Sequence, residues 1–115
     1  MSNINADIKS QQLKQVYLIY GDEAFLRRQY TNQLISALGV DESDMNFSVF
    51  KGEALDSQGV ANTINTVPFL SDKRVTVIYD SGFLNSPNEI MADCIKHIPE
   101  ASYVIFNESD LIFES

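Results

Sequence analysis

Four short apolar runs, each rich in β-branched and aromatic residues, alternate along the chain with segments whose apolar residues recur at helical spacing. The runs cover residues 16–20, 46–50, 75–79 and 103–106. The first is apolar throughout, which is typical of a strand buried on both faces. Such alternation predicts a parallel sheet with helices on both faces and right-handed crossovers. We therefore expect one three-layer α/β domain over residues 1–115.

Turn-forming and capping residues indicate where the first two of the intervening helices begin and end. Asp22 follows a strand and can cap a helix that ends at Gly39. Asp56 or Ser57 opens the next helix. This second helix must stop before Pro68, because the residue ahead of a proline is pushed out of helical geometry.

The third intervening helix has a clear start signal. Ser86 is placed to cap it, Pro87 to occupy its first position, and Glu89 to complete a capping box. Its apolar face runs up to Pro99, which ends it. A further short helix around Ala6–Gln12 also fits the polar start of the chain.

Composition excludes several classes of protein. Sixteen acidic residues against eight basic ones give a net charge of −8, which disfavours general nucleic-acid binding and attachment to acidic membrane surfaces. The single Cys94 and single His97 exclude an internal disulfide and a multi-ligand metal cage, and they fit a buried thiol and a helix-end imidazole. No apolar run approaches the ~18 residues of a membrane span, and the start lacks a secretory signal, so we expect a cytoplasmic protein.

The turn after the first strand lies where a phosphate-binding loop would lie in a nucleotide hydrolase. Aligned from Gly21 with the pattern G-x-x-x-x-G-K-[ST], the chain has Leu26, Arg27 and Arg28 in place of the glycine, lysine and hydroxyl residue. We therefore interpret Gly21 as a turn residue, and we predict neither a catalytic residue nor a bound cofactor. A small nucleotide hydrolase with a degenerate loop is the alternative function.

Two polar residues at strand ends carry a weaker signal. Asp80 follows the third strand, where a carboxylate holds magnesium in NTPases, and Asn107 follows the fourth. Without a phosphate loop both fit loop positions better, and we predict no metal site. A response-regulator-like signalling domain is a third alternative, but it needs an acidic cluster at its strand ends. Apart from the turn pair Asp22 and Glu23, Asp80 is the only carboxylate there.

The connection before the third strand contains three consecutive apolar residues, Pro68, Phe69 and Leu70. In one interpretation they fold back onto the core, which the residues alone favour because connections commonly bury an apolar side chain. In the other they form an exposed hydrophobic wedge that enters a pocket of a partner protein.

Several segments match a known family in their order and spacing. They are Val16-Tyr17-Leu18-Ile19-Tyr20-Gly21-Asp22-Glu23 with Phe25-Leu26, then Asn46-Phe47, and then Pro68-Phe69-Leu70-Ser71-Asp72-Lys73-Arg74 before a valine-rich strand. From about Val16 to Phe106 the chain resembles the bacterial DNA polymerase III delta subunit, the clamp-loader component that opens the sliding clamp.

For the fold, the resemblance implies an AAA+-type domain that has lost nucleotide binding and that forms the N-terminal fragment of a longer multidomain chain. It implies that the strands lie in the spatial order second, third, fourth, first. The outer edge of the first strand is then left for a fifth strand beyond Ser115. An unpaired edge also predicts some self-association of the fragment.

For function, the resemblance implies a part in opening the sliding clamp during DNA replication, within the DNA-directed DNA polymerase holoenzyme. Pro68, Phe69 and Leu70 correspond to the clamp-binding element of the family. The partners implied are the sliding clamp (beta subunit) and the other clamp-loader subunits, with DNA contacted only indirectly through the full complex.

Overall fold

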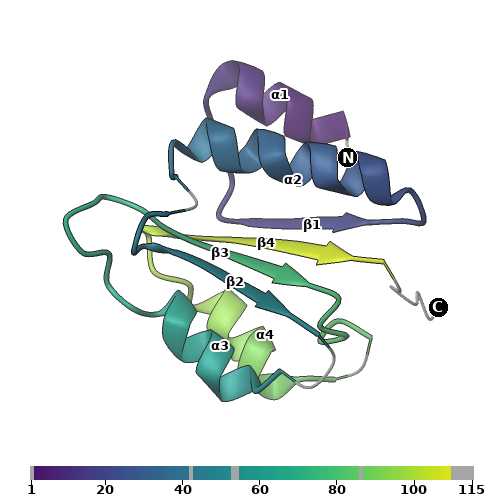
Figure 1. The fold of residues 1–115 in the computed structure, drawn as a ribbon. Helices are drawn as coiled ribbons and strands as arrows, with labels where there is room; N and C mark the ends of the chain where they lie inside the picture. The colour runs from purple at the N-terminus through teal and green to yellow at the C-terminus, as the bar shows by residue number, and fades with distance from the viewer. Residues whose placement is uncertain (1, 42, 53–54, 86, 110–115) are drawn as a thin grey trace.

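Helices and strands alternate along the chain as the sequence predicts (Figure 1). The structure, a computed structural model, describes residues 2–41, 43–52, 55–85 and 87–109. The elements within these residues are α1 (Ser2–Ser10), β1 (Val16–Tyr20), α2 (Ala24–Leu38), β2 (Phe47–Lys51), α3 (Ser57–Ile64), β3 (Arg74–Tyr79), α4 (Glu89–Lys96) and β4 (Ser102–Glu108).

The strands form one parallel sheet in the order β1-β4-β3-β2. This order confirms the predicted arrangement of second, third, fourth and first strand. β3 and β4 occupy the centre and are the most buried strands, whereas β1 and β2 lie at the two edges. β1 therefore lies at an edge of the sheet, as the resemblance implies. Self-association through its outer edge stays a prediction.

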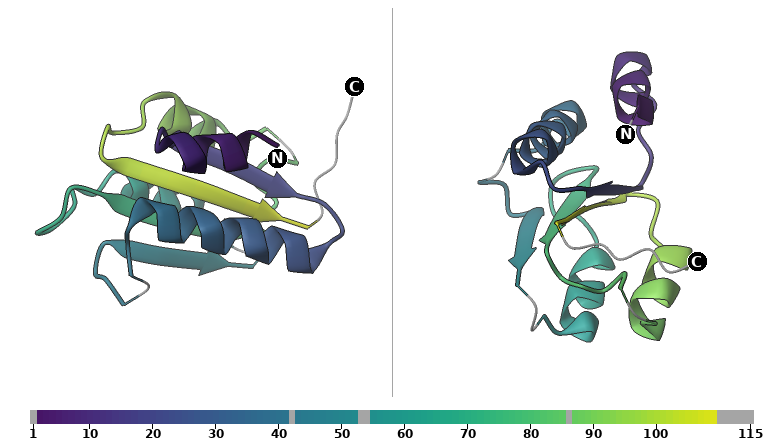
Figure 2. Two further views of the ribbon diagram at one scale, coloured as in Figure 1. Left: turned by 90° about the horizontal axis from the view of Figure 1, so that it is seen from above. Right: turned by 90° about the vertical axis from the view of Figure 1, so that its right-hand side faces the viewer.

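The helices α1 and α2 lie on one face of the sheet and α3 and α4 on the other, as Figures 1 and 2 show. Because side chains alternate along a strand, neighbouring residues of β3 and β4 serve opposite cores. Val77 and Ile105 pack toward α1 and α2, while Ile78 and Phe106 pack toward α3 and α4. The three-layer α/β architecture predicted from the sequence is confirmed.

β1 departs from the prediction that it is buried on both faces. Tyr17 and Ile19 are buried in the α1–α2 core, but Val16 and Leu18 are only partly buried on the other face, and Tyr20 is exposed. The cause is the position of the strand: at the edge of the sheet, the helices of the second face cover it only in part. The uninterrupted apolar sequence of β1 therefore predicted more burial than the strand has.

The caps of α2 and α4 lie one and two residues later than predicted. α2 is preceded by Glu23 rather than Asp22 at its cap position, and no side chain caps it, although Gly39 ends the helix in the left-handed conformation as predicted. α4 begins at Glu89 with Asn88 as its cap, because the Asn88 side chain accepts a hydrogen bond from the main-chain N–H of the third helical residue. Ser86, the predicted cap, lies outside the described residues.

The remaining helix ends show the same pattern. Asp56 caps α3 as predicted, but α3 ends at Ile64, well before Pro68, and α4 ends at Lys96 rather than at Pro99. The short N-terminal helix is present but starts earlier than expected, at Ser2. Capping and proline signals therefore locate each helix but not its last turn.

One buried hydroxyl gives a stability prediction. Thr76 lies in the central strand β3, is fully buried, and its Oγ1 has no hydrogen-bond partner among the described residues. Thr76→Val replaces that hydroxyl by a methyl group of similar shape, so we expect the free energy of unfolding to rise by about 1 kcal/mol. Urea unfolding of the two chains measures the difference. A less stable variant contradicts the prediction, because it means that the hydroxyl is satisfied.

Candidate functional site

The connection between α3 and β3, which we call the 65–73 loop, protrudes from one end of the sheet in Figures 1 and 2. Its apolar side chains face solvent: Val67 is 80%, Phe69 58% and Leu70 89% exposed, while Pro68 is half-buried. The interpretation that Phe69 and Leu70 fold back onto the core is therefore wrong. Exposed apolar side chains that cluster in one loop are typical of a protein-binding surface.

The 65–73 loop is held by a buried amide at the entrance to β2. The Asn46 Nδ2 donates to the Phe69 carbonyl, and the Phe69 N–H donates to the Asn46 Oδ1, with both distances 2.8 Å. Asn46 is 1% exposed, so these bonds are shielded from water. One side chain thus satisfies both main-chain polar groups of Phe69.

A buried arginine holds the start of the same loop. The Arg74 Nε donates to the Thr66 carbonyl at 2.8 Å, and its Nη2 lies 3.5 Å from the Asn46 Oδ1. The Thr66 carbonyl is thereby satisfied although α3 has already ended, which explains how the chain leaves the helix before Pro68. The Arg74 guanidinium and the Asn46 amide together fix the main chain of the loop at Thr66 and at Phe69.

Leu70 has a left-handed backbone conformation, with φ = +56°. Non-glycine residues rarely adopt this region, and a leucine there carries strain that its surroundings must compensate. The conformation turns the chain directly after the residue that Asn46 holds. Strain at an exposed apolar residue in a fixed loop points to a functional position rather than to a packing requirement.

At the other end of the strands, where a phosphate-binding loop would lie, the turn after β1 is bonded to a side chain of α2. The Arg27 guanidinium donates to the Gly21 carbonyl through Nη1 and to the Asn107 Oδ1 through Nε at 3.0 Å. Asn107 in turn donates to the Thr31 hydroxyl at 3.0 Å. We call these contacts the Arg27 network. Gly21 adopts a positive φ of 129°, which suits the turn residue that the sequence predicts.

The carboxylates that follow β3 and end β4 are used in structural bonds. The Asp80 carboxylate accepts from the N–H and the hydroxyl of Ser109, and chiefly the N–H bond lowers the pKa of Asp80. The Glu108 carboxylate accepts from the N–H and the hydroxyl of Ser81. Within the described part of the chain no group of three or more His, Cys, Asp or Glu side chains is placed to hold a metal ion.

Glu108 gives a pH-dependent prediction. Burial is the main cause that raises the pKa of Glu108, outweighing the Ser81 hydrogen bonds that lower it. As pH rises above the ordinary carboxyl range, the unfolded chain therefore releases this proton before the folded chain does, and stability falls. We expect the stability of the wild type relative to Glu108→Gln to decrease between pH 4 and 7, up to the raised folded pKa. Urea unfolding across this range measures it, and a difference that is constant or grows contradicts it.

Cys94 and His97 do not form a site together. Cys94 is buried on α4, and burial is the main cause that raises the pKa of its thiol. His97 occupies the cap position after the helix, is largely exposed, and lies 3.6 Å from the Asp93 carboxylate. This arrangement fits the predicted buried thiol and helix-end imidazole.

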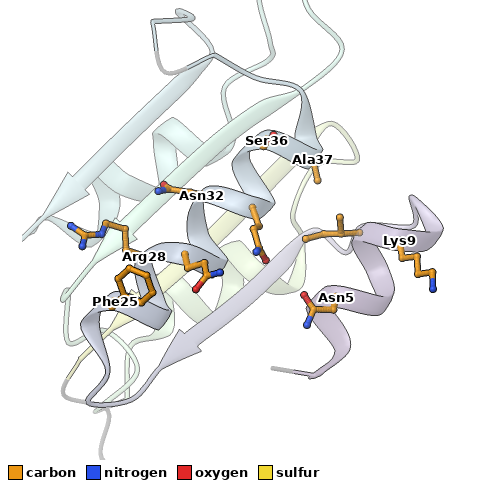
Figure 3. Close-up of a pocket in the computed structure, with 10 residues that line it drawn as sticks. Asn5, Lys9, Phe25, Arg28, Asn32, Ser36 and Ala37 are labelled. Carbon is orange, nitrogen blue, oxygen red and sulfur yellow. The ribbon is translucent and has the colours of Figure 1, made fainter.

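A groove of about 830 Å³ lies between α1 and α2 (Figure 3). It is lined by Asn5, Ile8, Lys9, Phe25, Arg28, Gln29, Asn32, Gln33, Ser36 and Ala37. None of these lining residues is a carboxylate, histidine or cysteine, so the groove offers no acid–base pair for catalysis.

In the described residues, no helix is long and apolar enough to cross a membrane.

Sequence reasoning missed three residues of the 65–73 loop and its support: Val67, Asn46 and Arg74. Asn46 was named as the first residue of a strand, and both Asn46 and Arg74 as parts of segments that match the delta family, but neither was expected to hold the loop. The sequence did hold a signal. Because β2 and β3 pair in parallel, Asn46, which precedes β2, lies beside the end of the 65–73 loop, which precedes β3. That Asn46 reaches across to Phe69 depends on side-chain geometry that spacing does not encode.

The strand order and the helices on both faces define a three-layer α/β domain with a parallel sheet, in which Arg27 is bonded to the turn after β1 and to the end of β4. The family follows from the sequence, since the model described as DNA polymerase III, delta subunit matches residues 17–115. The chain belongs to this family. No curated protein matches its sequence.

A solved structure has the same fold. The Bacillus subtilis DNA clamp loader delta protein (YqeN) superimposes with a TM-score of 0.81 over 99% of this chain, at 18% sequence identity. The likeness at this identity concerns the fold. The chain spans 37% of the length of the Bacillus subtilis protein.

Proposed function

We propose that this chain is the N-terminal domain of a clamp-loader delta subunit and that it binds a sliding clamp through the 65–73 loop. Pro68, Phe69 and Leu70 form the contact, with Phe69 and Leu70 as the side chains that enter a hydrophobic pocket. Membership of the delta family and the fold of the Bacillus subtilis clamp loader protein support a role in clamp loading for DNA replication. The other clamp-loader subunits are further partners of the longer protein.

The observation that carries the proposal is an exposed apolar pair on a loop that is nevertheless fixed. Phe69 and Leu70 present their side chains to solvent while Asn46 and Arg74 hold the main chain beneath them. A fixed loop loses little conformational freedom on binding, so more of the contact energy appears as affinity. An aromatic and an aliphatic side chain side by side are typical of the few residues that dominate an interface.

We further propose that this domain contributes binding rather than nucleotide hydrolysis, and the Arg27 network supports this. Its guanidinium is bonded to the Gly21 carbonyl and to Asn107, so the cation at the lysine position of the aligned phosphate-loop pattern is already engaged within the protein. The degenerate hydrolase considered from the sequence therefore gains no support from this end of the sheet.

Direct binding tests the proposal. The chain is titrated against the purified sliding clamp (beta subunit) encoded by the same genome, with surface plasmon resonance or calorimetry as the readout. We expect saturable binding that weakens in Leu70→Ala. Absence of binding at about 100 µM, an affinity worth less than ~5.5 kcal/mol, contradicts the proposal.

A further inference from the structure

Asn46 is anchored to the sheet more firmly than an ordinary loop residue. Its main-chain carbonyl accepts a hydrogen bond from the Val75 N–H at 2.9 Å, which extends the β2–β3 pairing by one residue. Its side chain is therefore projected from the rigid end of the sheet and not from a free segment. Any main chain bound to that side chain inherits the same fixed position.

The two bonds from Asn46 converge on one residue of the 65–73 loop. The amide donates to the Phe69 carbonyl and accepts from the Phe69 N–H. This paired geometry resembles one step of a β-ladder and fixes the peptide planes on both sides of Phe69. The direction in which the Phe69 side chain leaves the main chain is thereby set.

The consequence extends to the next residue. The carbonyl that Asn46 holds belongs to the peptide bond between Phe69 and Leu70, and Leu70 has the strained φ of +56°. Holding this peptide plane restricts the chain at the point where it must turn. Without the bond, the loop has access to extended conformations that a leucine prefers and that point its side chain elsewhere.

We infer that Asn46 is a positioning residue for clamp binding: through Phe69 it presets the directions of the Phe69 and Leu70 side chains before the clamp is met. This inference rests on the proposed function. Asn46 itself is buried and is not offered as a contact. Its contribution to affinity is the conformational freedom that the loop no longer has to lose on binding.

The test compares Asn46→Ala with a matched control, Asn107→Ala. Asn107 is also a buried asparagine with two side-chain hydrogen bonds, but it lies at the opposite end of the strands. We expect Asn46→Ala to weaken binding to the purified sliding clamp about ten-fold, and Asn107→Ala to leave the affinity within about two-fold, although both lower the melting temperature. Equal losses of affinity overturn the inference, because they mean that general destabilisation is the cause.

A double-variant cycle gives a readout that a merely structural role would not move. If Asn46 acts through the directions of the anchor side chains, its removal matters less once an anchor is gone. We therefore expect Asn46→Ala to cost less than about three-fold in a Leu70→Ala background. An undiminished ten-fold loss in that background overturns the inference.

Asn46→Asp keeps the test open if the alanine variant does not fold. The carboxylate keeps the acceptor for the Phe69 N–H and faces the Arg74 guanidinium, but it cannot donate to the Phe69 carbonyl. We expect a stable chain with weakened clamp binding, because the peptide plane between Phe69 and Leu70 is released. Unchanged affinity in this variant contradicts the inference.

Failure of the inference differs from failure of the proposed function. If the wild-type chain does not bind the clamp, the proposed function fails. If the wild type binds, Leu70→Ala weakens binding and Asn46→Ala binds like the wild type, only the positioning role of Asn46 fails.

Discussion

Replacing Phe69 and Leu70 together by alanine is expected to weaken clamp binding at least ten-fold while the melting temperature changes little. Each side chain that fills a pocket contributes about 2 kcal/mol, and ~1.4 kcal/mol corresponds to a factor of ten in affinity. Two such anchors dominate a modest interface. Both side chains are mostly exposed in the free chain, so their removal leaves no cavity. Binding to the purified clamp and a melting curve measure the two effects.

A control removes two partly exposed apolar side chains elsewhere. Leu84 and Ile90, which lie before and within α4, are 37% and 42% exposed and are not part of the 65–73 loop. Their joint replacement by alanine should leave clamp affinity unchanged. If Phe69→Ala/Leu70→Ala binds like the wild type, or if the control loses as much affinity, the loop is not the contact.

Phe106→Ala is expected to have the opposite signature: a large loss of stability. Phe106 is 1% exposed in β4 and packs in the core beneath α3 and α4. Truncating a phenylalanine in such a place costs about 3–5 kcal/mol, because transfer energy is lost and a cavity remains. For a domain of this size the melting temperature should fall by roughly 10–20 °C. Thermal unfolding followed by circular dichroism measures the fall.

The control for Phe106 is a phenylalanine in solvent. Phe25, at the start of α2, is 66% exposed, and Phe25→Ala should change the free energy of unfolding by no more than about 0.5 kcal/mol. A small effect of Phe106→Ala would mean that the two-sided burial of β4 is wrong. Replacing phenylalanine by alanine is thus expected to lower clamp affinity at Phe69 and stability at Phe106, and to change little at Phe25.

The strands were predictable because the residues that decide them are local, whereas their spatial order followed from the resemblance to the delta family. β-branched runs such as Val75-Thr76-Val77-Ile78 form strands wherever both faces are covered, and β3 is buried along most of its length. The right-handed crossover rule then leaves few ways to connect four parallel strands. The burial of an edge strand depends on which helices cover it, and the strand's own residues do not determine that. Val16 and Leu18 are accordingly less buried than the apolar run suggests.

The site was predictable only in part, for a related reason. Pro68, Phe69 and Leu70 stood out as apolar residues in a connection, but their exposure depends on what holds the loop away from the core. Asn46, distant in sequence, and Arg74 provide that hold through bonds to Phe69 and Thr66. The same holds for Arg27, whose contact with Asn107 joins residues 80 positions apart.

The placement of the 65–73 loop at one end of parallel strands has a mechanical consequence. A pull on the loop acts along the axis of β3, whereas the hydrogen bonds that join β3 to β2 and β4 run across that axis. Such a pull loads these bonds together in shear, so that they share the force. A force exerted at the loop is therefore transmitted through β3 to its neighbours β2 and β4.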